Sequence, residues 1–162
     1  MKDIVIRSAR DEDSEHLILL IDRVFAEYPG CILDVDAEMP ELRTPASAAE
    51  ADAGRWWVAE MNGRIVGSVA VVPEDEDGIL ELKKLYVSPD ARRKGLGAHL
   101  VSLAEREARD RGASSIVLWT DTRFRDAHRL YQRLGYARAP RTRVLNDLSK
   151  TVEFHYTKEL GP

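Results

Sequence analysis

Residues 82–100 of the chain read LKKLYVSPDARRKGLGAHL, and this stretch decides the fold. Its apolar start predicts a strand that ends at Val87, Pro89 stops that strand, and a helix begins near Gly97. The first backbone N–H groups of a helix have no partner within the helix, and they carry a partial positive charge. Glycines at this point let the backbone approach a bulky anion closely. The stretch therefore predicts a cradle for a diphosphate or a polyphosphate.

Three cations, Arg92, Arg93 and Lys94, stand beside the glycines and suit the same anionic ligand. The segment lacks the Gly-x-x-x-x-Gly-Lys-Ser/Thr loop of nucleoside triphosphatases, and Leu100 stands where the dinucleotide fingerprint has its third glycine. Contact with nucleic acid is disfavoured because few aromatic residues are nearby and the isoelectric point is about 5.6. A solvated basic loop that caps a helix remains an alternative on this segment alone.

Upstream of this stretch, two apolar runs flank Asn62-Gly63, the dipeptide that best tolerates the backbone of a two-residue hairpin turn. Apolar spacing and glycine or proline breaks define the other elements. The expected strands are residues 4–6, 56–61, 64–72, 79–87, 115–120, 136–139 and 151–159, and the expected helices follow Asp11 and cover 46–53, 95–112 and 126–134. This order and the length predict a single domain over residues 1–162.

Two sequence motifs within these elements resemble those of a known protein family. The stretch at 82–100 resembles motif A of the GNAT superfamily of acyl-CoA-dependent N-acyltransferases, whose Arg/Gln-x-x-Gly-x-Gly/Ala signature matches residues 92–97. Residues 127–136, AHRLYQRLGY, resemble the family's following motif, Ala-x-x-Leu-Tyr-x-x-x-Gly-Phe/Tyr. The resemblance is close over residues 79–139 and looser before them. It implies an α/β fold of the α+β type, in which helices flank a mixed, mostly antiparallel sheet of six or seven strands.

The resemblance also implies that acetyl-CoA is the acyl donor. Its diphosphate is then expected on the N–H groups of residues 93–98, and its pantetheine arm beside residues 85–87, where two strands splay apart after a bulge. Many members have an asparagine at the position of Phe124, and that asparagine helps to hold the pantetheine arm. Phe124 cannot make the same hydrogen bond, and we expect it to pack against the cofactor instead. The expected cofactor-binding residues are Leu85, Tyr86, Val87, Arg92, Arg93, Lys94, Gly95, Leu96, Gly97, Ala98 and Phe124.

An alkylammonium with a pKa of about 10.4 must lose a proton before its nitrogen attacks a thioester, so this reaction needs a base. Glu81 is similar in position to the catalytic glutamate of histone-acetylating members, and an ordinary polar residue on a half-exposed strand is the alternative. Tyr131 aligns with the family tyrosine that protonates the leaving thiolate, and a core aromatic residue is the alternative. A backbone N–H of Leu85 or Tyr86 is expected to polarise the thioester carbonyl.

The loop after the first helix and the last strands are expected to select the acceptor. The candidate contacts are Tyr28, Asp34, Asp36, Asp121 and His155. The carboxylates and the phenol in residues 28–38 favour a cationic amine, and a plain solvated acidic loop explains them equally well. Asp121 is also a turn former, and His155 borders the acceptor channel only if the Glu153 and His155 side of its strand faces inward.

The charge is distributed unevenly along the chain. Residues 1–78 carry 7 Lys or Arg against 18 Asp or Glu, while residues 79–162 carry 17 against 10. An acidic half suits an amine and a basic half suits a phosphorylated ligand, although attraction between the halves of one fold explains the split as well. No run approaches the roughly 20 apolar residues of a membrane span, and the N-terminus has no secretory signal, so we expect a cytoplasmic protein without membrane partners.

The cysteine and histidine content bears on metals and on mechanism. Cys31 is the only cysteine, and His16, His99 and His128 lack the spacing of metal ligands, so no metal site is expected. We predict acetyl transfer from acetyl-CoA to a primary amine of a small molecule or peptide, by direct attack in a ternary complex, because Cys31 lies outside both motifs. A non-catalytic acyl-CoA sensor is the alternative. Nucleic acid is not an expected partner, and homodimers are common in the resembling family.

Overall fold

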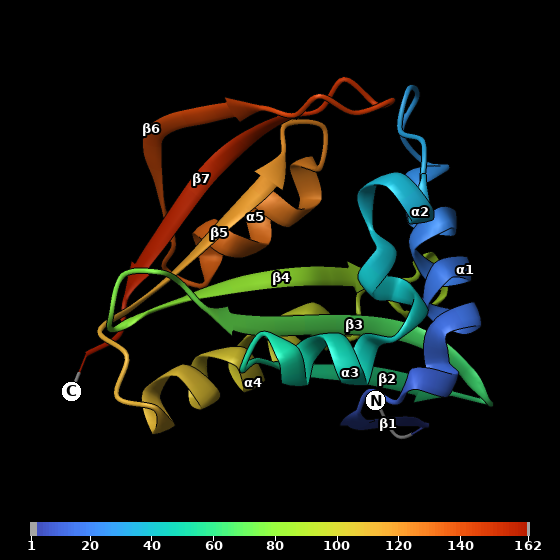
Figure 1. Cartoon of the computed structure of the whole chain (residues 1–162), viewed down its shortest axis with the longest axis horizontal. Helices are drawn as coiled ribbons and strands as arrows, with labels where there is room; N and C mark the ends of the chain where they lie inside the picture. The colour runs from blue at the N-terminus through green and yellow to red at the C-terminus, as the bar shows by residue number, and fades with distance from the viewer. Residues whose placement is uncertain (1–2, 162) are drawn as a thin grey trace.

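The computed structural model describes residues 3–161, and its centre is a twisted seven-stranded sheet (Figure 1). The strands are β1 (Ile4–Ser8), β2 (Arg55–Met61), β3 (Arg64–Pro73), β4 (Ile79–Val87), β5 (Ser115–Asp121), β6 (Ala137–Val144) and β7 (Val152–Glu159). Their spatial order is β1-β2-β3-β4-β5-β7-β6, and every neighbouring pair is antiparallel except β4 and β5. The prediction of a mixed, mostly antiparallel sheet of six or seven strands is confirmed.

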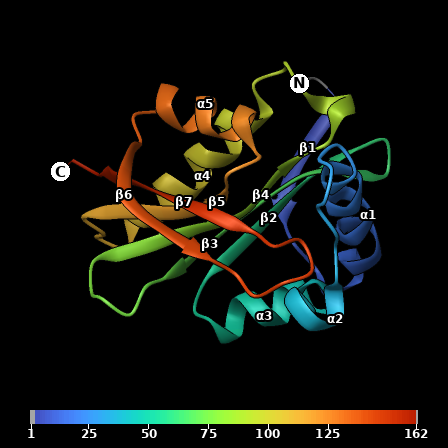
Figure 2. The same cartoon turned by 90° about the horizontal axis from the view of Figure 1, so that it is seen from above.

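Helices cover both faces of the sheet, which makes three layers (Figure 2). One face carries α1 (Ser14–Phe25), α2 (Val35–Glu38) and α3 (Pro45–Ala51), and the other carries α4 (Leu96–Asp110) and α5 (Arg125–Arg133). A separate apolar core lies under each set of helices, with Leu17, Ile21 and Val58 in the first and Leu100 and Tyr156 in the second. Of the helices in residues 3–161, none combines the length and the apolar content needed to span a bilayer.

Local sequence accounts for the elements that surround the site. Asn62 and Gly63 have φ angles of 52° and 76°, which is the left-handed pair that a two-residue hairpin turn requires. The helix α4 buries Leu96, Leu100 and Ala104, spaced four residues apart, so that one apolar stripe faces the sheet. Both features follow the sequence prediction.

Two regions differ from the expected pattern. The segment after α1 contains the short helix α2 and a 3-10 turn at Pro40–Arg43, where the sequence predicted a loop before a helix at 46–53. The strand β6 runs to Val144 instead of ending at 139, because it is an edge strand that tolerates Pro140 beside a register shift between Ala139 and Thr142. An edge strand that is exposed along most of its length leaves little apolar periodicity to detect.

The strands β4 and β5 separate halfway along their length, and this separation positions the site. They pair only from Ile79–Leu82 to Ser115–Leu118, after which β5 continues beside β7 alone. A register shift between β3 and β4 occurs at the same point, where Lys84 has a φ of 55°. Figure 1 shows β5 and β7 diverging from β4 beyond this point. Residues 83–87 therefore border a wedge that opens into the molecule.

Candidate active site

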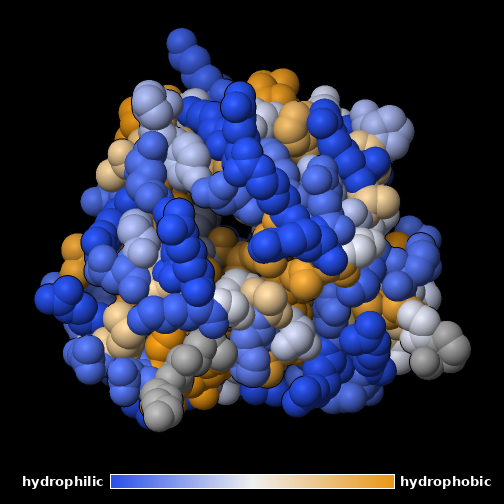
Figure 3. All heavy atoms as spheres, turned by 180° about the vertical axis from the view of Figure 1, so that it is seen from behind, coloured by the Kyte–Doolittle hydropathy of each residue, from blue (hydrophilic) through white to orange (hydrophobic). Residues whose placement is uncertain are grey.

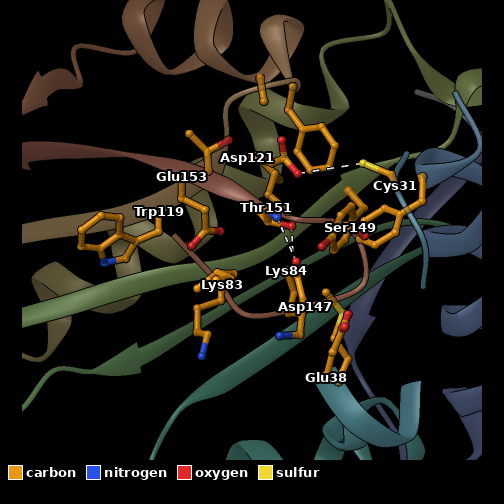
Figure 4. A pocket seen from close by; sticks show the side chains of 18 of the residues that line it. Cys31, Glu38, Lys83, Lys84, Trp119, Asp121, Asp147, Ser149, Thr151 and Glu153 are labelled. Carbon is orange, nitrogen blue, oxygen red and sulfur yellow. Dashed lines mark hydrogen bonds between the residues drawn. The ribbon is translucent and has the colours of Figure 1, made fainter. Parts of the chain in front are cut away.

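A cavity of about 330 Å³ occupies the wedge between β4 and β5. Its walls come from five places in the chain, namely the end of α1 with the segment up to Met39, the second half of β4, the end of β5, the helix α5, and residues 145–153. The side chains in Figure 4 converge on this space from both sides of the sheet. The face seen from behind Figure 1 is hollowed near its centre, with apolar side chains beside the hollow (Figure 3).

The loop before α4 forms a cradle of backbone N–H groups. None of the N–H groups of residues 93–98 donates a hydrogen bond to an acceptor within residues 3–161. Gly95 adopts a φ of 75° and Arg93 a φ of 62°, which turns successive N–H groups toward one side. A Cβ at Gly97 would lie 3.0 Å from a methyl group of Leu130, so a larger residue there would require the Leu130 side chain to shift. The unpaired N–H groups lie where the sequence predicted them, and the binding of a diphosphate to them stays a prediction.

Two arginine–carboxylate pairs fasten the cradle loop to α1. Arg92 binds both oxygens of Glu27 at 2.7 and 2.6 Å, and Arg23 binds both oxygens of Asp90 at 2.6 and 3.0 Å. Arg92 therefore positions the loop, in addition to any charge that it offers to a ligand. The exposed side chains of Arg93 and Lys94 form no ion pair with another described residue.

The strand edge beside the cavity is the second half of β4. Within the described chain, Leu85, Tyr86 and Val87 have β3 on one side and no strand on the other. Leu85 and Tyr86 line the cavity together with Phe124, while Val87 lies toward Gly97 at the start of α4. Backbone groups on the open side are free to pair with an extended amide-bearing ligand. Phe124 packs against Tyr28 with ring centroids 4.9 Å apart, so an aromatic cluster closes this end.

Tyr131 of α5 lines the cavity from the side opposite α1. Its ring is 4% exposed and lies between Tyr136 and Tyr156, with centroids 5.8 Å away in each case. The hydroxyl has no hydrogen-bond partner among residues 3–161 and adjoins the cavity. Burial raises the pKa of Tyr131, with a smaller contribution from Tyr156. The hydroxyl is therefore kept protonated and free to donate.

Glu81 lies near the cavity but not on its wall. It pairs with Val117, so it shares a face of the sheet with Trp119, which does line the cavity. Burial and the hydrogen-bonding carboxyl of Glu74 together raise the pKa of Glu81 to about 7, against the opposing charge of Lys83. A carboxyl with this pKa can accept and release a proton at neutral pH.

Four carboxylates line the part of the cavity formed by residues 31–39, the end of β5 and residues 145–153. We call this part the acceptor end, because the sequence predicts the acceptor there. Other groups of the protein already bind each of the four carboxylates. Asp121 accepts from Nε and Nη2 of Arg123 at 3.0 and 2.8 Å, and Glu153 accepts from Arg143 at 2.6 Å. Glu38 and Asp147 accept from backbone N–H groups of residues 148 and 151, at 3.0 and 2.9 Å.

Two lysines line the same end, and they differ in their surroundings. Lys84, whose side chain is 11% exposed, binds Glu41 at 3.1 Å, and burial lowers its pKa. Lys83 is exposed, and its side chain points away from Asp121 and Cys31 in Figure 4.

Several residues predicted to contact the acceptor lie elsewhere. Asp34 accepts from the N–H of residue 37 at 3.2 Å and caps α2, and Asp36 binds Arg43 at 3.2 Å on the surface. Tyr28 reaches the cavity only through Phe124. His155 is buried beside Trp119, with ring centroids 4.3 Å apart, and its Nδ1 has no partner in residues 3–161. Of the five predicted residues, Asp121 alone lines the cavity, while His155 supports a residue that does.

Sequence reasoning missed other residues of the cavity wall. Cys31, which the sequence placed outside both motifs, lies on the wall with its sulfur 3.9 Å from Oδ2 of Asp121, and burial raises its pKa. Met39 and Ser149 also line the cavity. These residues come from irregular segments more than 100 positions apart, and no local sequence signal marked them. Among residues 3–161 no three His, Cys, Asp or Glu side chains are grouped as metal ligands would be.

Comparison with known proteins agrees with this geometry. The sequence profile described as the acetyltransferase (GNAT) family matches residues 18–136, which is most of the chain. The chain belongs to the GNAT family. The resemblance drawn from residues 82–100 and 127–136 is thereby confirmed.

Relatives and solved structures extend the same GNAT assignment. The chain is 32% identical over 139 residues to the uncharacterized N-acetyltransferase YjgM of Escherichia coli, covering 82% of this chain and 81% of that protein. It superposes on a GNAT acetyltransferase from Staphylococcus aureus Mu50 with a TM-score of 0.83 at 22% identity, over 98% of this chain and 99% of that one. A putative acetyltransferase of Salmonella typhimurium, YncA, described with its cofactor acetyl-CoA, gives a TM-score of 0.72 at 20% identity, over 98% and 95%.

Proposed function

We propose that this GNAT protein transfers the acetyl group of acetyl-CoA to a primary amine by direct attack in a ternary complex. The observation that carries this proposal is that three features follow one another along β4 and the loop after it. Within residues 3–161, the N–H groups before α4 have no acceptor and residues 85–87 have no strand on one side, and Leu85 and Tyr86 line the same cavity as Tyr131.

The donor would be held mainly by backbone groups. The N–H groups of residues 93–98 bind the diphosphate, and the exposed Arg93 and Lys94 add positive charge beside it. The free edge at residues 85–87 pairs with the amides of the pantetheine arm, and Phe124 packs against that arm. When bound, acetyl-CoA supplies an activated acetyl thioester. A backbone N–H of Leu85 or Tyr86 then polarises its carbonyl, which is worth about 3 kcal/mol for a well-placed donor.

Glu81 acts as the base for the acceptor amine. Its raised pKa lets it take the proton of an ammonium group near pH 7, whereas an ordinary carboxylate is a much weaker base. Because Glu81 lies beside the cavity and not on its wall, the proton passes through a bound water. The lone pair left on the amine nitrogen attacks the thioester carbon.

Tyr131 acts as the acid for the leaving group. Its hydroxyl has no protein partner to which the proton is already committed, and burial keeps the phenol neutral. Donation of this proton to the departing sulfur avoids release of a free thiolate. The acceptor nitrogen loses its second proton as the amide forms, and Tyr131 recovers a proton from it through solvent. The products are the amide, the free thiol of CoA and one proton, which is the proton that Glu81 took from the ammonium.

Direct attack remains the preferred route even though Cys31 lines the cavity. Burial and the nearby carboxylate of Asp121 raise the pKa of this thiol, which keeps it protonated and weakly nucleophilic. A Cys31→Ala variant is therefore expected to retain transfer, and burst release of CoA before acceptor addition is not expected.

The test measures acetyl-CoA binding by calorimetry and thiol release with a panel of primary amines. Binding together with amine-dependent thiol release supports the proposal. Binding without release for any amine indicates an acyl-CoA sensor instead. Absence of binding refutes the donor site at residues 93–98.

A further inference from the structure

Residues 145–151, between β6 and β7, form a rigid turn and not a loose loop. Asp147 accepts from the N–H of Thr151 at 2.9 Å and from its hydroxyl at 2.7 Å. The N–H of Leu145 donates to the carbonyl of Thr151 at 2.9 Å, which closes the base of the turn. Ser149 and Thr151 are buried, although both lie in a connection between strands. The turn therefore has one defined shape.

The same turn is fastened to the segment that follows α1. The N–H of Ile32 donates to the hydroxyl of Ser149 at 2.8 Å, and that hydroxyl donates to the carbonyl of Ile32 at 3.0 Å. The N–H of Leu148 donates to Glu38 at 3.0 Å. These three hydrogen bonds join residues 110 or more positions apart, and they link the two halves of the molecule across the wedge (Figure 1). We call this contact the bridge.

The bridge passes over the acceptor end of the cavity. Cys31 and Glu38 lie on its first side, Ser149 and Asp147 on its second, and all four line the cavity (Figure 4). The space beneath it is about 330 Å³, and the acyl end of the donor would take part of that space. Cavities of roughly 300–1,000 Å³ hold small molecules, whereas docking of a folded protein buries about 800 Å² of surface on each partner. The volume of this cavity therefore suits a small molecule better than a docked protein surface.

We propose that the acceptor is a free amine of low molecular mass, bound whole beneath the bridge, and not a lysine or N-terminus of a protein. This inference rests on the proposed function, because it names the acceptor class of the same site. Ser149 is a positioning residue in this account, since its hydroxyl makes two of the three hydrogen bonds of the bridge. An acceptor chain that left the cavity between residues 31–38 and residues 145–151 would have to break those bonds.

The first arm of the test presents one amine group at increasing size. The acceptors are a broad panel of free amines, lysine blocked at its α-amine and carboxyl, lysine-containing peptides and folded proteins with exposed lysines, each assayed for thiol release. The proposal expects the highest kcat/KM for a free amine, at least tenfold above that of any peptide or protein. A peptide or a protein as the best acceptor overturns it. No thiol release from any acceptor refutes the proposed function itself, which is a different result.

The second arm removes the hydroxyl that holds the bridge. Ser149→Ala is expected to raise the KM for the best free amine about tenfold and to change kcat less than threefold. The ratio of kcat/KM for the free amine to kcat/KM for peptides should then decrease. Ser102→Ala is the matched control, because that hydroxyl donates to the carbonyl of His99 on the exposed side of α4, remote from the cavity. If Ser149→Ala matches Ser102→Ala in both KM and acceptor preference, the bridge does not select the acceptor. Equal thermal midpoints for the two variants show that folding is intact in the comparison.

Discussion

The role of Glu81 is most sharply tested by replacing it with glutamine and following kcat/KM against pH. With a pKa of about 7, Glu81 is about one-tenth ionised at pH 6 and nine-tenths ionised at pH 8. If the bound acceptor is an ammonium that Glu81 deprotonates, kcat/KM of the unaltered protein rises about tenfold between these pH values and then levels off. The logarithmic plot has a slope of one below pH 7 and a plateau above it.

Glu81→Gln removes the base, so only amine molecules that are already neutral can react. For an amine with a pKa of about 10.4, roughly one molecule in 2,500 is neutral at pH 7. A general base typically contributes about 10²–10⁴-fold, and we expect kcat/KM at pH 7 to fall at least a hundredfold. The slope of one should then continue to about pH 10, so that the difference between the two proteins shrinks as pH rises.

Two further variants separate this explanation from a general effect of charge. Glu74→Gln removes the neighbouring carboxyl that raises the pKa of Glu81, so its inflection is expected below pH 7 with a similar plateau. Glu76→Gln makes the same charge change in the exposed turn nearby and should leave the profile unchanged. Initial rates with a saturating donor, from pH 5.5 to 9.5, give the profiles. An inflection near pH 7 that persists in Glu81→Gln would falsify the assignment of Glu81 as the base.

Three other changes follow from the geometry. Tyr131→Phe should lower kcat at least tenfold in a thiol-release assay, and an unchanged kcat contradicts the role of Tyr131 as the acid. The thermal midpoint should stay nearly unchanged, because the hydroxyl has no hydrogen-bond partner in residues 3–161. Gly95→Ala strains a residue at a φ of 75° by about 1 kcal/mol and should weaken CoA binding in calorimetry. The control Gly63→Ala, at a φ of 76° in a distant turn, should lower stability by a similar amount and leave CoA affinity unchanged. Tyr136→Phe removes a 2.8 Å hydrogen bond to the buried carboxylate of Glu105 and should cost about 2 kcal/mol, seen by calorimetry as a thermal midpoint lower by roughly 4–8 °C; a drop under 1 °C argues against this bond.

Local chemistry made much of the fold predictable. The turn at Asn62-Gly63 and the glycines before α4 sit where the backbone needs a positive φ or a free N–H, and few other residues serve there. The apolar stripe of α4 and the two family motifs fixed the central strand, its cradle and the position of Tyr131. Each of these features depends on neighbours within about ten residues, which is the range that a sequence pattern reports.

The features that the sequence did not reveal depend on distant partners. Lys84 carries a φ of 55° at the point where β4 and β5 separate, and a lysine gives no sign of that conformation. Arg92 matched a ligand-binding motif, and its bidentate pairing with Glu27 appears only when α1 packs against the loop. Asp34 and Asp36 read as acceptor contacts because of their charge, while in the fold they cap α2 and bind Arg43 on the surface.

Two of the stretches that line the acceptor end contribute no residue to the pairing of β1 through β7, whereas Asp121 and Glu153 at the same end are paired. Residues 31–38 join α1 to α2 and its neighbouring turn, and residues 145–151 reverse the chain between the last two strands. The diphosphate cradle and the strand edge beside it belong to a different part of the chain. Exchanging both stretches with those of another GNAT protein should therefore transplant its choice of amine while the grip on the nucleotide is kept. If these two connections select the amine as proposed, changes confined to them are enough to alter the acceptor.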